Sequence, residues 1–142
     1  MDSERGHRAV PHTADVILEA WAPDATGCFE EAVAALVDTC AEPARDDDTH
    51  VAPRPLVVPA GARDTQLLRL LDEVIFALDT AEGVPVAAEV REGVDGTLDV
   101  VLRLAPIDRV VPSGSVPKAI SHSELQVHES PERVCCRFLV DV

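Results

Sequence analysis

The first part of the chain changes from strand-like to helix-like spacing of its hydrophobic residues. Residues 15–21 predict a strand, because alternate positions share one apolar face: Val16, Leu18 and Ala20. Apolar residues then recur every three or four positions, which predicts a helix over about 27–40. Asp24 or Thr26 is the expected N-cap of this helix.

The middle of the chain predicts a loop, a short strand and a second helix. Residues 41–54 are rich in Pro and Asp and are expected to form a loop. Residues 56–58 are apolar and predict a short strand. Asp64 or Thr65 is expected to begin a helix over about 65–79, with the apolar stripe Leu67, Leu68, Leu71, Val74, Ile75 and Leu78.

Strict alternation of apolar and polar residues in the second half predicts two antiparallel hairpins. The first joins residues 86–91 and 98–104 through a turn with an Asp-Gly pair, a strong hairpin signal. The second joins residues 125–127 and 134–140. Residues 105–117, which contain three prolines, are expected to form a loop between the hairpins.

This order of elements predicts an α+β fold, in which two helices pack on a largely antiparallel sheet with two C-terminal hairpins. A chain of 142 residues has the size of one domain, so residues 1–142 are expected to form a single domain. Since aromatic residues make up 3% of a chain that is 46% hydrophobic, the core should be aliphatic. The single Trp21 and the three Phe are each expected to have a packing role.

The chain is strongly acidic. It has 12 Lys and Arg against 26 Asp and Glu, and a formal net charge of −14. Because affinity for nucleic acid depends largely on basic side chains that neutralise phosphates, direct nucleic acid binding is not expected. A cation or a basic protein partner fits this charge better, although acidity can equally serve solubility alone.

The sequence suggests neither a membrane segment nor a disulfide framework. No apolar stretch approaches the roughly 20 residues that cross a bilayer, and the polar residues 1–10 do not resemble a signal peptide. No membrane association and a cytoplasmic location are therefore expected. The cysteines lack zinc-ligand spacing and are expected to be reduced and mostly buried: Cys28, Cys40, Cys135 and Cys136.

Polar residues near the two ends of the chain are candidates for a metal site. His12 and Asp15 could share a cation, or could simply be a turn histidine and an Asp that caps local amides. Asp141 and the carboxylate of Val142 follow an apolar strand, and such oxygen ligands suit magnesium, calcium or manganese. If the first and last strands pair, Asp15 and Asp141 could converge, and their repulsion would favour a bound cation.

Other polar residues give weaker signals. Lys118 could pair with the acidic residues or contact a phosphate or a partner, or could be an ordinary exposed lysine at a strand entry. The triplet 46–48 (Asp-Asp-Asp) is expected to be solvated loop. No role is assigned to the remaining histidines, the first two of which are expected in loops: His7, His50, His122 and His128. No nucleophile, phosphate-loop or zinc-protease motif occurs, which argues against a self-sufficient enzyme.

Five segments, in order and over nearly the whole chain, resemble the archease family. They are 11–21 (PHTADVILEAW), 29–36 (FEEAVAAL), 67–80 (LLRLLDEVIFALDT), 118–121 (KAIS) and 138–142 (FLVDV). The resemblance implies an α+β accessory protein that activates an RtcB-type RNA ligase in tRNA splicing and RNA repair. Such a protein promotes guanylylation and turnover of the ligase and is not itself catalytic.

The resemblance also implies a site on this chain. Asp15 and Asp141 would be the acidic ligands of a divalent metal, with Val142 close by, and His12 and Lys118 would lie near it. Two other functions stay open. The chain could be a general chaperone or interaction module in which calcium fastens the chain ends together, or a metal-dependent phosphoester hydrolase.

Overall fold

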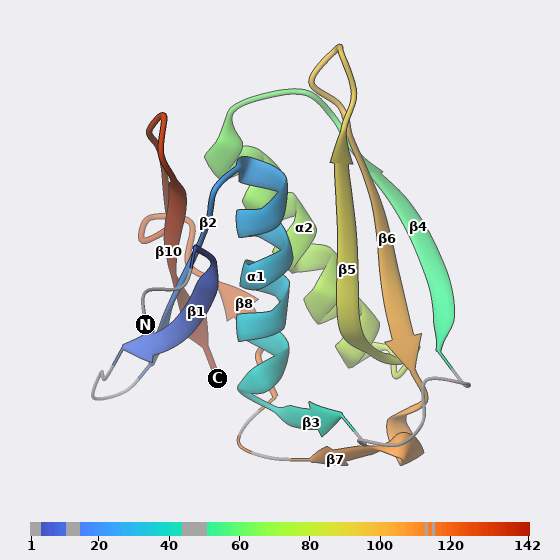
Figure 1. Ribbon diagram of the computed structural model, residues 1–142. Coiled ribbons are helices and arrows are strands. Elements are labelled where there is room, and N and C mark those ends of the chain that lie inside the picture. Colours follow the sequence, from blue (N-terminus) through green and yellow to red (C-terminus); the bar gives the residue numbers. More distant parts are fainter. Residues whose placement is uncertain (1–3, 11–14, 44–50, 113, 115) are drawn as a thin grey trace.

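The computed structural model describes residues 4–10, 15–43, 51–112, 114 and 116–142. Two helices lie between two antiparallel sheets (Figure 1). The elements, in chain order, are β1 (Gly6–Val10), β2 (Val16–Ala22), α1 (Ala25–Asp38), β3 (Ala41–Pro43), β4 (Ala52–Val58), α2 (Arg63–Asp79), β5 (Val84–Glu92), β6 (Leu98–Ala105), a 3₁₀ helix (Ile107–Arg109), β7 (Val110–Pro112), β8 (Ala119–Ile120), β9 (Gln126–Glu129) and β10 (Val134–Asp141). This arrangement confirms the predicted α+β class.

The predicted single sheet is divided into separate sheets. The larger one, here called the terminal sheet, has the order β1-β2-β10-β8, with β9 also paired to β10. The second has the order β4-β6-β5, and β3 pairs with β7 in a small third sheet. The two expected hairpins are both present but belong to different sheets, with α1 and α2 packed between them (Figure 1).

Helix α1 follows the predicted pattern closely. Asp24 is its N-cap, and Oδ1 of Asp24 accepts a hydrogen bond of 2.8 Å from the backbone N–H of Gly27. This contact satisfies one of the amides that a helix start leaves unpaired. The helix begins and ends two residues before the predicted bounds, and its buried face includes Cys28, Phe29, Ala32, Val33 and Leu36.

Helix α2 differs from its prediction at the start and on its buried face. It begins at Arg63, with Ala62 at the N-cap position and no side-chain cap, so neither Asp64 nor Thr65 begins it. Gln66 is buried although it is polar, because its side-chain amide donates hydrogen bonds to the carbonyls of Pro59 and Gly96. The fully buried apolar positions are Leu67, Leu70, Leu71, Val74 and Ala77, whereas Leu68, Ile75 and Leu78 are only partly buried.

The two predicted loops each contain short strands that the sequence pattern did not reveal. Within 41–54, β3 occupies the first three residues and β4 begins at Ala52, while residues 44–50, with the Asp triplet, lie outside the described part. Within 105–117, a 3₁₀ helix and β7 form instead. Prolines at two positions of β4 are tolerated because β4 is an edge strand, where a missing N–H breaks no sheet hydrogen bond.

The core is mainly aliphatic, as predicted, and two of the three Phe belong to it. Phe29 and Phe138 are fully buried, whereas Phe76 is 53% exposed, so a packing role for every Phe was wrong. The large side chains around them are Leu18, Leu36, Leu67, Leu70, Leu71, Leu98 and Leu102. All four Cys are free thiols and three are buried, and the adjacent Cys135 and Cys136 differ in burial because successive residues of β10 face opposite ways. In the described part of the chain, neither helix has the length and apolar character required to span a bilayer.

Candidate metal centre

Asp15 and Asp141 lie just beyond the end of the β2–β10 ladder. These strands pair antiparallel, as the prediction of convergence required, and the last pair of the ladder joins Val16 to Val140. Asp15 precedes Val16 and Asp141 follows Val140, so the two carboxylates belong to the same end of the terminal sheet. Asp15 is half-buried and Asp141 is exposed.

Strand β8 adds Lys118 to the same end of the terminal sheet. Asp141 pairs with Ala119, and the backbone N–H of Lys118 donates a 2.8 Å hydrogen bond to the carbonyl of Asp141. The backbone N–H of Ser121 donates a second bond, of 3.0 Å, to the carbonyl of Leu139. Lys118 is therefore fixed by backbone contacts beside Asp141, and its side chain is exposed.

An open hollow of about 540 Å³ lies between this end of the sheet and helix α2. Its lining combines Lys118 with Asp72 and Asp79 of α2 and with exposed apolar side chains of Phe76 and Val116. Burial raises the pKa of Asp72 above its usual value, and the neighbouring Glu73 adds to this, although His122 and Arg69 act in the opposite direction. Asp72 could not be singled out from the sequence, because one Asp on the polar side of a helix has no distinguishing pattern.

The described residues include three of the predicted metal ligands and near-site residues at this end of the sheet: Asp15, Lys118 and Asp141. Asp15 and Asp141 offer carboxylate oxygens of the kind that magnesium, calcium and manganese prefer. Val142, whose carboxylate was the third predicted ligand, is half-buried against the core. No group of three or more His, Cys, Asp or Glu side chains that could hold a metal occurs within the described residues, so two side chains would need further ligands. His12 lies outside the described residues.

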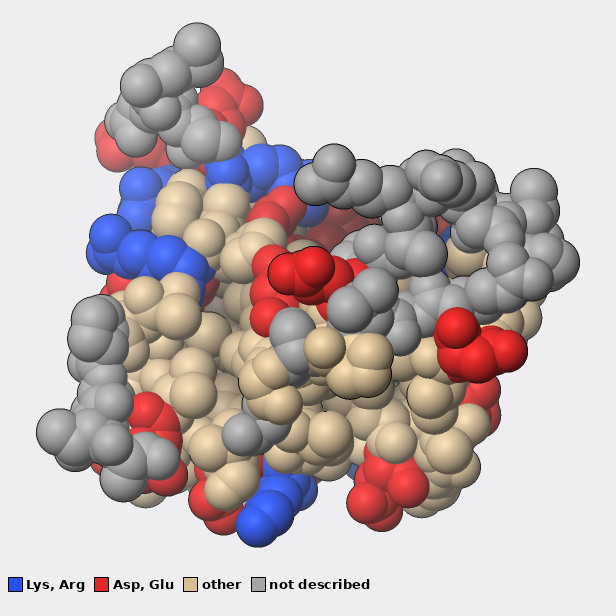
Figure 2. Space-filling view, turned by 90° about the horizontal axis from the view of Figure 1, so that it is seen from below, with Lys and Arg blue, Asp and Glu red and all other residues tan. Residues whose placement is uncertain are grey.

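Uncharged surface lies between the charged groups on the face seen from below. Asp and Glu form separate groups there, and Lys and Arg gather toward its edges (Figure 2). Ile107 and Val116 are 45% and 59% exposed and, with Cys40, Leu78 and Val84, line a small apolar pocket of about 190 Å³. An exposed apolar area beside charged residues is typical of a surface that contacts another protein.

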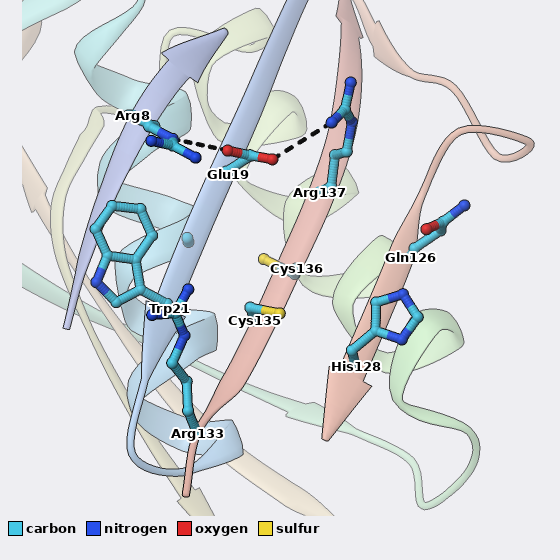
Figure 3. A pocket seen from close by; sticks show the side chains of 10 residues that line it. Arg8, Glu19, Trp21, Gln126, His128, Arg133, Cys135, Cys136 and Arg137 are labelled. Atoms are coloured by element: carbon cyan, nitrogen blue, oxygen red, sulfur yellow. Dashed lines mark hydrogen bonds and ion pairs between the residues drawn. The ribbon is translucent and has the colours of Figure 1, made fainter. Parts of the chain in front are cut away.

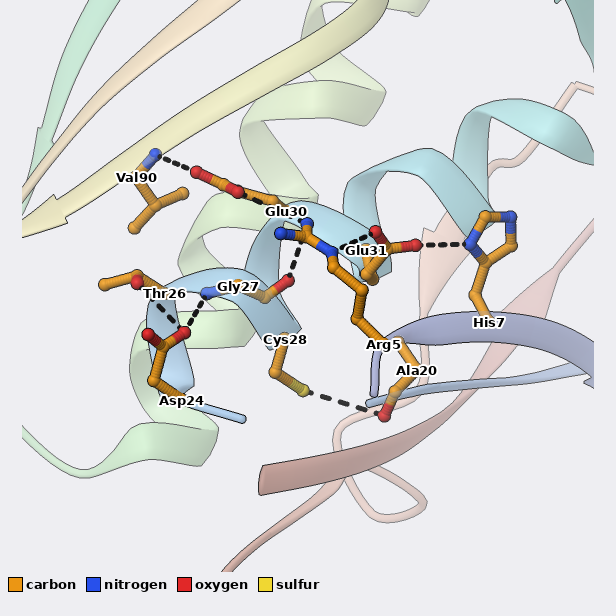
Figure 4. Close-up of polar contacts among 10 residues, drawn as sticks. All are labelled: Arg5, His7, Ala20, Asp24, Thr26, Gly27, Cys28, Glu30, Glu31 and Val90. Atoms are coloured by element: carbon orange, nitrogen blue, oxygen red, sulfur yellow. Dashed lines mark hydrogen bonds and ion pairs between the residues drawn. The ribbon is translucent and has the colours of Figure 1, made fainter. Parts of the chain in front are cut away.

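A second cluster of charged residues holds β1 against α1, and the sequence did not predict it. His7 lies in β1 and not in a loop. Its Nδ1 lies 2.8 Å from Oε1 of Glu31 (Figure 4). Its Nε2 lies 2.8 Å from Oδ2 of Asp38. Nε of Arg5 donates to Oε2 of Glu31 at 2.7 Å. Burial lowers the pKa of His7, but the hydrogen bonds to the two carboxylates outweigh it, so the pKa of His7 is raised.

Known proteins with a similar sequence or fold agree on one family. Residues 7–142 match the archease protein family. A Mycobacterium tuberculosis protein named "Probable protein archease" is 38% identical over 137 residues, which cover 96% of this chain and 75% of that protein.

Two solved structures share the fold. Protein 1598 of Methanobacterium thermoautotrophicum has a TM-score of 0.73 at 18% identity, and the match covers 96% of this chain and 99% of that one. An archease from Thermotoga maritima, described as a possible chaperone, has a TM-score of 0.67 at 15% identity, and the match covers 95% of this chain and 96% of that one. This chain therefore belongs to the archease family.

Proposed function

We propose that this archease is an accessory factor that activates an RtcB-type RNA ligase, and that a divalent cation at the Asp15 and Asp141 end of the terminal sheet is part of its active form. It promotes guanylylation and turnover of the ligase in tRNA splicing and RNA repair, and it has no catalytic activity of its own. Family membership supports the class of function.

The observation that carries the proposal is the register of β2 and β10. The ladder ends at Val16 and Val140, and the residues that flank this pair are Asp15 and Asp141, 126 positions apart in the chain. Like charges at directly opposite positions destabilise a sheet. A divalent cation removes this repulsion, with Asp15, Asp141 and the carboxylate of Val142 as its ligands and calcium, magnesium or manganese as candidates.

Lys118 is the second functional residue of the proposal. Its backbone is bonded to Asp141, while its side chain lines the hollow with Asp72. A lysine in this position can bind a phosphate or a carboxylate of the partner as a point charge. The apolar side chains of Phe76 and Val116 beside it would supply the buried part of the contact.

The net charge of −14 favours a partner with a basic surface. A ligase that holds RNA needs such a surface, since phosphate binding depends on Lys and Arg. The cation would provide a positive centre at one point of an otherwise acidic protein.

Single-turnover guanylylation of the RtcB-type ligase from the same organism tests this function. The assay compares the ligase alone, with wild-type archease, and with archease after removal of divalent cations by a chelator and gel filtration. Of the three samples, we expect faster guanylylation only in the one with untreated wild-type archease. Adding one of the candidate cations back to the depleted archease should restore the acceleration. A ligase that reacts at one rate in all three cases would rule out the proposed function.

A general chaperone is the second candidate, and two observations favour it. The Thermotoga maritima relative is described as a possible chaperone. Phe76, Ile107 and Val116 are exposed apolar side chains on one part of this surface. Suppression of aggregation of an unrelated unfolding enzyme, lost in Phe76→Ser, together with no effect on the ligase, would favour the chaperone over the activator.

A further inference from the structure

The outer face of the terminal sheet carries a groove, here called the Trp21 groove, of about 460 Å³. It lies on the face turned away from α1 and α2, and side chains of four strands project into it (Figure 3). We infer that this groove binds a short single strand of nucleic acid, through its phosphates and bases. The inference does not depend on the proposed metal site, which lies at the end of the sheet.

The strand register arranges the groove in two rows. In the first row, Arg8, Glu19, Arg137 and Gln126 are consecutive cross-strand neighbours on β1, β2, β10 and β9. In the second row, Trp21 of β2 has Cys135 of β10 as its neighbour, and His128 of β9 follows. Arg133, at the end of the β9–β10 turn, completes the lining.

The ratio of arginine to carboxylate in the groove is the reverse of that in three other ion-pair clusters. Arg5, Arg54 and Arg63 each form ion pairs with two carboxylates. In the groove the ratio is inverted, because Glu19 pairs with both Arg8 at 2.7 Å and Arg137 at 3.4 Å. A chain of net charge −14 therefore has a local excess of positive charge at this place.

Both guanidiniums paired with Glu19 keep donors for another anion. Glu19 accepts from Nε of Arg8 and from Nη1 of Arg137. A guanidinium has five N–H donors, so a single contact with Glu19 does not use all the donors of either arginine. The side chains of Arg8 and Arg137 are 68% and 50% exposed, so a phosphate could reach both without a change of fold.

The rest of the lining favours nucleotides over a simple anion. The guanidinium carbons of Arg8 and Arg133 lie 5.8 Å and 5.6 Å from the centroid of the Trp21 ring. Aromatic rings and the planes of stacked guanidiniums are the surfaces on which unpaired bases stack. The imidazole of His128 and the amide of Gln126 point into the same groove (Figure 3) and can stack on a base or bond its edge.

Gly6 leaves the space that the Trp21 ring occupies. A Cβ atom at position 6 would lie 2.7 Å from Cζ2 of Trp21, so any other residue would displace the indole. The glycine opposite Trp21 in the register lets the ring lie across β1. The aromatic surface of the groove thus depends on a residue with no side chain.

The binding is expected to be weak and confined to a few nucleotides, because the acidic remainder of the surface repels a long polyanion. Contacts from three arginines predict that the logarithm of the affinity falls with the logarithm of salt concentration with a slope of about −2. Between 50 and 200 mM salt this slope corresponds to a loss of affinity of about 16-fold.

Trp21 provides the assay, because the chain has one Trp and no Tyr. Five-nucleotide oligouridine and oligothymidine are titrated into the full chain while the Trp21 fluorescence is recorded. We expect saturable quenching with the salt dependence given above, and about tenfold weaker binding for Arg133→Gln and for Arg137→Gln. The control is Arg103→Gln, on the other sheet and in an ion pair with Glu89, which should bind as the wild type does.

Circular dichroism and thermal unfolding check that each variant is folded. We expect folded variants, because the substituted side chains are exposed. No saturable fluorescence change, or unchanged affinity in both groove variants, would overturn the inference. So would a pentaglutamate peptide that binds as tightly as the oligonucleotides, since the groove would then recognise acidic peptides.

Discussion

Asp15 and Asp141 are the residues that flank the Val16–Val140 pair, at the shared end of β2 and β10. They are far apart in the sequence, and the antiparallel pairing of these two strands puts both at one end of the terminal sheet. The residue before β8, Lys118, donates a backbone hydrogen bond to Asp141, so all three polar residues belong to one end of the terminal sheet.

The first prediction concerns cation binding. If Asp15 and Asp141 hold a divalent cation, calcium, magnesium or manganese at 100 times its dissociation constant should stabilise the wild-type fold by about 2.7 kcal/mol. The Asp15→Asn, Asp141→Asn double variant should gain no stability from the cation. Thermal unfolding with and without cation measures this.

In the absence of cation, the same double variant should be no less stable than the wild type, because the substitution removes the repulsion between two carboxylates. The control is Asp99→Asn, at an exposed position of β6, which should respond to the cation as the wild type does. Equal stabilisation of the double variant by the cation would place the cation elsewhere.

The second prediction concerns Gly6. Gly6→Ala should destabilise the protein by roughly 1–3 kcal/mol, because the new Cβ overlaps the Trp21 ring and the ring must move. The emission of Trp21 should shift at the same time. Gly61→Ala is the matched control, because a Cβ at position 61 meets nothing within 4 Å, and it should leave both the stability and the emission unchanged.

The third prediction concerns pH and His7. The raised pKa of His7 means that its contacts with Glu31 and Asp38 stabilise the fold fully below the ordinary value of 6.5. This contribution is lost as the pH rises through the raised pKa. His7→Gln should therefore destabilise the protein most below pH 6.5, and the difference from wild type should shrink at higher pH.

Glu31 limits this effect at the acidic side. Burial raises the pKa of Glu31, but the hydrogen bonds from His7 and Arg5 lower this pKa by more than burial raises it, so the net shift is downward. The contribution of Glu31 is present above the ordinary value of 4.5 and is lost as the pH falls through the lowered pKa. Chemical denaturation of wild type, His7→Gln and the control His128→Gln between pH 4 and 9 tests both limits, and a pH-independent difference for His7→Gln would contradict this account.

The fourth prediction concerns Gln66, the buried polar residue of α2. Gln66→Leu should cost about 2–4 kcal/mol of stability, because the carbonyls of Pro59 and Gly96 lose their donor in a buried place. Gln66→Glu keeps the shape but replaces the amide donor by an acceptor, and should be at least as destabilising near neutral pH. Urea denaturation measures both, and a Leu variant as stable as the wild type would show that water replaces the amide.

Much of the fold could be predicted, because its longest elements have strong periodic patterns. Helix α1 was placed within two residues, and the Asp-Gly turn indicated the β5–β6 hairpin, where Gly96 has a φ of 88°. Strand β1 and the short β3 and β7 were missed, because their polar or proline-containing residues show no alternation. Their pairing is set by tertiary contacts, as that of His7 with α1 shows.

The residues of the candidate metal centre could be named from the sequence, and their role as ligands stays a prediction. Asp15, Lys118 and Asp141 were candidates from their positions beside predicted strands, and the resemblance of the segments that contain them supplied their roles. The Trp21 groove had no such signal. Its residues come from four strands between positions 8 and 137, and only the strand register makes them neighbours.

Single-turnover guanylylation of the RtcB-type ligase with Asp141→Asn archease is the most direct test of the central claim, with Asp99→Asn as the matched control. The backbone bond from Lys118 to Asp141 survives the substitution, so a folded protein is expected. The account predicts that wild type and Asp99→Asn accelerate guanylylation and that Asp141→Asn does not. Full acceleration by a folded Asp141→Asn variant would contradict it.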